Sequence, residues 1–139
     1  MIRSFVVLLF FLPIVAGAQD VASLLSRAVQ LEGQFREEEA LPVYEQVIRL
    51  RPDQVFAWCR CSDLSCRIGN RQTNKDRKVA MFKEGYAYAR SAWRLDSTNS
   101  EVNIAMAFSL ARMALIQNGK ERITTARGYQ TVCGECDPV

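Results

Sequence analysis

The sequence contains no histidine among its 139 residues. Histidine is the usual general acid or base near neutral pH, the commonest metal ligand, and the usual activator of serine and cysteine nucleophiles. Its absence excludes Ser-His and Cys-His catalysis and any histidine metal ligand. The chain also lacks a glycine-rich phosphate loop and any Ser/Lys or paired-carboxylate arrangement. The sequence therefore predicts no enzymatic activity, no cofactor and no metal site.

A strong excess of charge of one sign is also missing. The chain has 18 basic and 15 acidic residues, for a net charge of +3. This balance does not favour nucleic acid as a partner. The one basic stretch, Asn70–Lys78, is interpreted as a solvated loop or a frayed helix start rather than an anion-binding site.

Only one long hydrophobic run is present, and it lies at the N-terminus. Residues 5–15 read FVVLLFFLPIV, after Arg3 and before the small residues Ala16-Gly17-Ala18. This order is typical of a secretory signal peptide, which we place at residues 1–18. The run is too short to span a bilayer, which needs roughly 20 apolar residues. An uncleaved N-terminal helix is the alternative.

Cleavage of that leader would leave residues 19–139 as one exported domain, in the periplasm or outside the cell. Removal of Arg3 reduces the 18 basic residues to 17 against 15 acidic ones, a net charge of +2. We expect no stable membrane insertion after cleavage.

No segment alternates apolar and polar residues with period two, so no strand is predicted. Apolar residues instead recur at steps of three and four, which predicts an all-α fold. The predicted helices cover residues 21–35, 37–50, 54–68, 79–95 and 101–117, with a sixth segment from 120 to about 136.

Local signals predict where these helices begin and end. Pro42 indicates either that the second helix starts near Leu41 or that it is kinked there. Asp53 is the expected N-cap of the third helix, and Gly69-Asn70 its expected end. The cluster 96–100 predicts a turn and a cap before the fifth helix.

The predicted helices come in pairs, and residues 21–54 carry a repeat signature. Ala28, Ala40, Tyr44 and Pro52 stand where the tetratricopeptide (TPR) pattern has two small residues, an aromatic residue and the final proline. The segment resembles a TPR unit, with further units at about 55–99 and 100–139, the last incomplete or uncapped. Stacked pairs of this kind bury each other's apolar faces.

The second unit is longer than the standard repeat, and the third needs an insertion near residue 118. The stretches EGYAYARSAWRLDSTNSEV and GKERI are similar to the TPR region of regulator-of-microtubule-dynamics-like proteins. The resemblance implies a right-handed α-solenoid. A plain helical bundle with coincidental alanine and proline placement is the alternative.

The TPR resemblance also implies a concave groove that binds a peptide or a partner helix. Aromatic side chains there would give apolar contact, and arginines would hold carboxylates. Ordinary helix-surface packing is the alternative for each position. The positions carried onto the groove include Cys59, and the residues chosen from them as candidates are Phe56, Asp63, Arg67, Glu101, Ile104, Phe108 and Arg112.

The implied partner is a protein or peptide, or another copy of the chain that stacks on the uncapped C-terminal end. The family's set of lysines and asparagines that binds chaperone tails is not present. The sequence thus predicts a non-enzymatic interaction scaffold.

Five cysteines are present, and Cys133-Gly134-Glu135-Cys136 forms a C-x-x-C motif. Such a pair can be a disulfide, a redox dithiol or half of a zinc site. No strand is predicted before it, which disfavours a thioredoxin-like site. Cys59 and Cys66 lie on one helix face about 10 Å apart, too far to bond. An exported thiol-redox or metal-binding protein that uses Cys133 and Cys136 is the alternative function.

Overall fold

The structure, a computed structural model, describes residues 14–117, 119–124 and 127. Those residues are helical apart from short turns and include no strand, which confirms the all-α prediction. Residues 119–124 are helical as well. The labelled helices are α1 (Ile14–Gly33), α2 (Glu37–Leu50), α3 (Val55–Arg71), α4 (Lys75–Leu95) and α5 (Ser100–Ile116).

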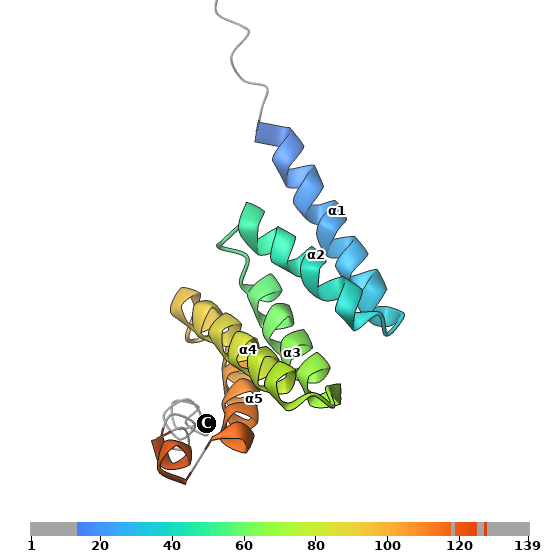
Figure 1. Cartoon of the computed structure of the whole chain (residues 1–139). Helices are drawn as coiled ribbons and strands as arrows, with labels where there is room; N and C mark the ends of the chain where they lie inside the picture. The colour runs from blue at the N-terminus through green and yellow to red at the C-terminus, as the bar shows by residue number, and fades with distance from the viewer. Residues whose placement is uncertain (1–13, 118, 125–126, 128–139) are drawn as a thin grey trace, which may run out of the picture.

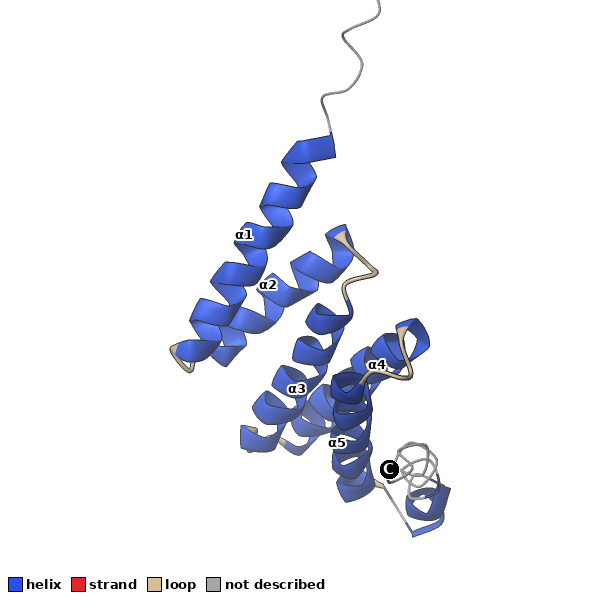
Figure 2. Ribbon diagram, turned by 180° about the vertical axis from the view of Figure 1, so that it is seen from behind, coloured by secondary structure: helices blue, strands red, loops and turns tan. Residues whose placement is uncertain are grey.

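Successive helices run back and forth, joined by short turns (Figure 1). α3 contacts α2, α4 and α5, while α1 packs on α2 (Figure 2). Short connections favour this antiparallel packing of neighbours. Within the described part of the chain, no helix is long and apolar enough to cross a membrane.

Two groups of buried side chains form the core, and one tryptophan joins them. The first group comes mainly from α1, α2 and α3 and includes the fully buried Tyr44 and Leu64. The second comes from α3, α4 and α5 and includes Val102. Trp58 packs against both groups, and its indole nitrogen donates a hydrogen bond of 2.8 Å to the Pro52 carbonyl. The apolar core is therefore continuous along the row of helices.

Two glycines allow α3 and α4 to approach closely. A Cβ atom at Gly69 would lie 2.8 Å from Met81 Cβ, and one at Gly85 would lie 2.7 Å from Cys66 Sγ. Real Cβ atoms do not tolerate such contacts. The prediction that Gly69-Asn70 ends the third helix is wrong, because Gly69 is a buried packing position and α3 continues to Arg71.

The turn between α1 and α2 has a backbone conformation that favours glycine but contains phenylalanine. Phe35 has a φ of 59°, and its side chain is 85% exposed. Its amide donates to the Glu32 carbonyl, and the Arg36 amide donates to the Leu31 carbonyl. This hydrogen-bond pair defines a Schellman motif, which ends α1 at Gly33 rather than at Phe35 as the periodicity predicted.

Pro42 lies inside α2, which begins at Glu37. A start near Leu41 is therefore wrong. Proline has no amide hydrogen, so the Glu38 carbonyl receives no helical bond from residue 42. Both residues are exposed, and water can satisfy that carbonyl.

Polar side chains at the other helix starts only partly follow the prediction. Gln54, not Asp53, precedes α3, and its side chain makes no capping hydrogen bond. The Asp53 carboxylate accepts two hydrogen bonds from Arg51. Asn74 caps α4 by accepting from the Arg77 amide, so this helix begins at Lys75, inside the stretch interpreted as a loop or a frayed helix start. Asn99 caps α5, as the turn cluster predicted.

The predicted leader overlaps the start of α1. This helix begins at Ile14, before the expected cleavage point between Ala18 and Gln19. The leader stays a prediction, and cleavage there would shorten α1 without removing the core residues from Val21 onward.

Candidate partner-binding pocket

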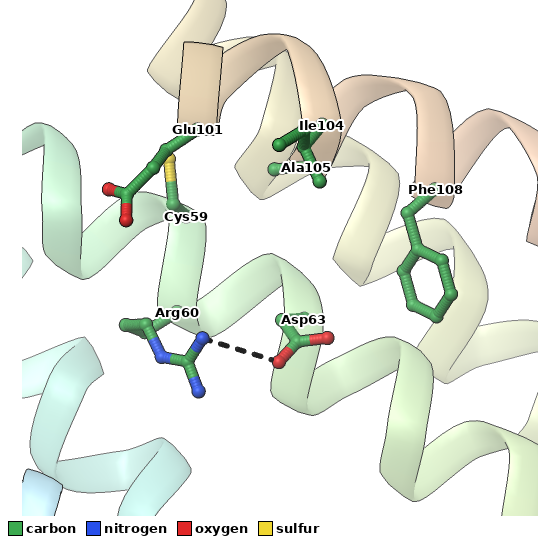
Figure 3. Close-up of a pocket in the computed structure, with 7 residues that line it drawn as sticks. All are labelled: Cys59, Arg60, Asp63, Glu101, Ile104, Ala105 and Phe108. Atoms are coloured by element: carbon green, nitrogen blue, oxygen red, sulfur yellow. Dashed lines mark ion pairs between the residues drawn. The ribbon is translucent and has the colours of Figure 1, made fainter. Parts of the chain in front are cut away.

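A pocket of about 330 Å³ opens between α3 and α5 (Figure 3). α3 contributes one wall with charged side chains, and α5 contributes the other with mainly apolar ones. We call it the α3–α5 pocket. It is lined by Cys59, Arg60, Asp63, Glu101, Ile104, Ala105 and Phe108.

Four of the seven predicted groove residues line this pocket. They are Asp63 from α3 and Glu101, Ile104 and Phe108 from α5. Residues three or four apart lie on one face of a helix, which explains why the three α5 side chains share a wall. The repeat pattern thus brought together residues that are 38 or more positions apart from Asp63 in the sequence.

The other three predicted residues contact other parts of the protein. The Phe56 ring packs edge-on against Tyr44, with 6.2 Å between ring centroids. Arg67 forms ion pairs with the buried Glu37 and, at 3.5 Å, with Asp63. The guanidinium of Arg67 is therefore already engaged by carboxylates of the fold.

Arg112 lies beside the pocket rather than in its lining. Its guanidinium carbon stands 4.7 Å from the centre of the Phe108 ring, in cation–π geometry. The same group donates a hydrogen bond of 3.4 Å to Asn70. Arg112 thereby restrains the Phe108 ring, which forms part of the pocket wall.

A charged network fixes Arg60 at the pocket wall. Arg60 forms an ion pair with Glu32 of α1 and another with Asp63, at 3.4 Å. The Tyr44 hydroxyl donates to the same Glu32 carboxylate at 2.7 Å. The hydrogen bond with Glu32 raises the pKa of Arg60, and burial raises that of Tyr44, so Arg60 stays charged and Tyr44 neutral.

Glu101 differs from these paired side chains. It is exposed in the first turn of α5, and no ion pair joins it to any residue that the structure describes. Asp63, in contrast, is shared by Arg60 and Arg67. The pocket therefore carries one carboxylate without a basic partner in the described chain.

The α5 wall exposes more apolar surface than a solvated helix normally does. Ile104 is 68% exposed and Leu115 is 62% exposed, while Phe108 is half-buried. The helix is apolar around most of its circumference. Helices of this kind are usually covered on all sides.

The thiols of the described chain are not activated for chemistry. Cys59, Cys61 and Cys66 are free and buried. Burial raises the pKa of Cys59 to about 11 and that of Cys66 to about 12, and raises that of Cys61 as well. Thiolates are the reactive form, so these thiols are poor nucleophiles and poor metal ligands near pH 7.

Two further observations concern metals and the C-terminal cysteines. Among the described residues, no three histidine, cysteine or acidic side chains are grouped to hold a metal ion. Cys133 and Cys136 lie outside the described residues.

Sequence reasoning missed Arg60 and Ala105 as pocket residues. Arg60 lies four residues after Phe56 and three before Asp63, and this spacing places it on the same face of α3. Its bond to Glu32 is a contact between α3 and α1 that no local pattern encodes.

The described residues form an all-helical protein in which neighbouring helices pack against each other and a pocket lies between α3 and α5. Residues 24–131 match the family of regulator of microtubule dynamics protein 1-3. This match covers most of the chain, and the chain belongs to that family. It confirms the similarity seen in the sequence. Comparison with curated proteins and with solved structures finds no significant match.

Proposed function

We propose that this protein is a non-enzymatic interaction protein that binds a peptide or a partner helix in the α3–α5 pocket. The main support is that four predicted groove residues line one pocket and that part of its apolar wall is exposed. The four residues are Asp63, Glu101, Ile104 and Phe108. At about 330 Å³, the pocket lies at the lower end of the usual range for ligand sites, roughly 300–1,000 Å³. That size suits one or two side chains of a partner.

The chemistry of the pocket favours binding over catalysis. Its thiol, Cys59, is held protonated by burial. Arg60 and Asp63 form an ion pair with each other. Each also pairs with a neighbour, Arg60 with Glu32 and Asp63 with Arg67. These groups supply neither an activated nucleophile nor a general base of the kind that histidine provides.

The proposed scaffold is a TPR-like stack. Support comes from the two small residues at the repeat positions, since Ala28 and Ala40 are fully buried. Tyr44, at the aromatic position, is fully buried too, and Trp58 connects the two core groups. A right-handed α-solenoid would place α3 and α5 on its concave face, and the pocket that these two helices line supports that arrangement.

The proposed location is outside the cytoplasm, because residues 1–18 have the pattern of a signal peptide. The family's description names regulators of microtubule dynamics. An exported protein would not meet microtubules, so we favour a component of the envelope, a secreted complex, or a second copy of the chain as partner.

Affinity recovery of partners from the native compartment tests this function. The test variants are Ile104→Asn and Phe108→Ala, and the matched control is Leu50→Asn, which replaces an exposed apolar residue outside the pocket. Phe56 is unsuitable because it packs on Tyr44. We expect both pocket variants to lose at least about tenfold of the recovered partner, with circular dichroism unchanged. Equal recovery by wild type, control and pocket variants contradicts the proposal.

The cysteine alternative is separated by a further variant. A Cys133→Ser, Cys136→Ser chain should recover the same partners as wild type. Loss of recovery in that variant, with an intact fold, favours the thiol function instead.

A further inference from the structure

We infer that the α3–α5 pocket selects a partner helix that carries an apolar anchor and, within about one turn of it, a lysine or arginine that faces Glu101. This inference rests on the proposed function and adds the chemical class of the partner. Three observations carry it: the charge balance of the pocket, the length of the exposed apolar stripe on α5, and the position of Glu101 relative to that stripe.

The charges on the pocket lining and in the ion-pair network attached to it cancel except for one, and Arg112, beside the pocket, lies outside that network. Glu32 and Asp63 neutralise Arg60, and Arg67 connects Asp63 to Glu37. Arg71 supplies the second positive charge on Glu37. Counted together, these three arginines and three carboxylates are neutral, so the uncompensated charge on the pocket lining is the carboxylate of Glu101. A cationic side chain on the partner would complement it.

The exposed apolar stripe of α5 is longer than the pocket. Ile104, Phe108 and Leu115 follow one another at steps of four and seven residues, which places them on one face of the helix. Eleven residues of helix extend about 16 Å. A single small molecule would leave most of that stripe exposed. An amphipathic helix, with anchors spaced by three, four and seven residues, matches its length and period.

The positions of the charged residues along α5 determine where the basic residue of the partner must lie. Glu101 lies in the first turn of α5, one turn before Ile104. Arg112 lies about three turns after Glu101. Its guanidinium is already stacked on the Phe108 ring. The basic residue of the partner must therefore lie over the N-terminal end of α5, beside the anchor that enters the pocket.

Selection from a displayed library of random 16-residue peptides tests this inference. The baits are the full exported chain in four forms: wild type, Glu101→Lys, Ile104→Asn and Glu38→Lys. Glu38→Lys is the matched control, since Glu38 is also an exposed glutamate in the first turn of a helix but lies outside the pocket. The selected peptides are then synthesised, and their Kd is measured against each form.

We expect wild type and Glu38→Lys to enrich peptides with lysine or arginine within one turn of a large apolar residue. Glu101→Lys should enrich aspartate or glutamate at that place. The best wild-type peptide should bind Glu101→Lys about tenfold more weakly, because one exposed attraction becomes a repulsion.

The remaining outcomes separate the inference from the proposed function. Peptides whose binding needs Ile104 but shows no charge preference, or an acidic preference, overturn the inference and leave the pocket as a binding site. Peptides that bind all four forms equally, or an absence of any enrichment, overturn both.

Discussion

Glu37, at the start of α2, forms ion pairs with Arg67 and Arg71 near the end of α3, and only 3% of its side chain is exposed. The sequence run of three glutamates is typical of a helix start, and all three do lie in the first turn of α2. The structure adds that the first of them points inward. It connects α2 to the α3 face that also carries Asp63 of the pocket.

Replacement of Glu37 by glutamine should lower the free energy of unfolding by about 1–2 kcal/mol. Breaking a fully buried pair costs about 3–5 kcal/mol, but Arg67 and Arg71 are partly exposed and can be rehydrated. Urea unfolding followed by circular dichroism measures the loss. The control Glu38→Gln, on an exposed neighbour, should change stability by less than about 0.5 kcal/mol. Equal effects of the two variants would show that the Glu37 pairs contribute nothing.

Alanine at Gly85 should destabilise the protein although alanine favours helix. A Cβ there meets Cys66 Sγ at 2.7 Å and the Ser62 carbonyl oxygen at 3.1 Å. Overpacking costs about 1–3 kcal/mol, against a propensity gain of about 1 kcal/mol, so we expect a net loss of up to about 2 kcal/mol.

Two companion variants make the Gly85 result interpretable. Gly33→Ala, with no neighbour within 4 Å, should gain up to about 1 kcal/mol. The Cys66→Ala chain lacks the clashing sulfur. In that chain, Gly85→Ala should cost less stability than it does in the wild type. If Gly85→Ala stabilises as Gly33→Ala does, α3 and α4 are not as close as described.

Glycine at position 35 should stabilise the protein by about 1 kcal/mol. A residue with a side chain at a φ of 59° carries a cost of roughly 1–2 kcal/mol that glycine avoids, less the entropy that glycine adds to the unfolded chain. Because the Phe35 side chain is 85% exposed, little burial is lost. Thermal unfolding compares Phe35→Gly with Phe35→Ala, which keeps the Cβ and should gain nothing. A destabilised Phe35→Gly would mean that the phenyl ring makes a contact that the fold requires.

Stability should fall above about pH 9, in part because of the buried thiols. An unfolded thiol ionises near pH 8.5–9, whereas burial raises the pKa of Cys66 to about 12. Between these values the unfolded state binds fewer protons than the folded state, so each buried thiol lowers stability by about 1.4 kcal/mol per pH unit.

Comparison of wild type with Cys66→Ala isolates this effect, with reductant present throughout. From pH 9 to 10.5 the wild type should lose about 2 kcal/mol more than the variant. Buried tyrosines contribute equally to both chains, so they cancel in the difference. Parallel losses in the two chains would contradict the protonated, buried state of Cys66.

Much of the fold follows from local sequence signals. Periodic apolar residues predicted the five labelled helices, and Asn99 was recognisable in its capping cluster. The failures come from contacts that helical periodicity does not encode. Gly69 has the sequence signal of a helix end. In the structure it is glycine because a side chain there would clash with Met81 of α4. Asp53 reads as a cap, but Arg51 holds its carboxylate.

The pocket was only partly predictable, for the same reason. Repeat positions identified the face of α3 and α5 that carries Asp63, Ile104 and Phe108. They could not show that Arg67 is engaged by Glu37, since the two residues are 30 positions apart and belong to different helices. Periodicity defines a helix face, whereas packing decides which charges on that face are neutralised.

Site-specific photo-crosslinking in the native compartment tests the central claim most directly. A benzophenone amino acid replaces Ile104 in the pocket wall or, as control, the exposed Ala87 of α4. The proposal predicts crosslinked partner bands from position 104 that are absent from position 87 and that disappear when Phe108→Ala is added. Identical bands from both positions, or no crosslink from position 104, would contradict a partner-binding role for the α3–α5 pocket.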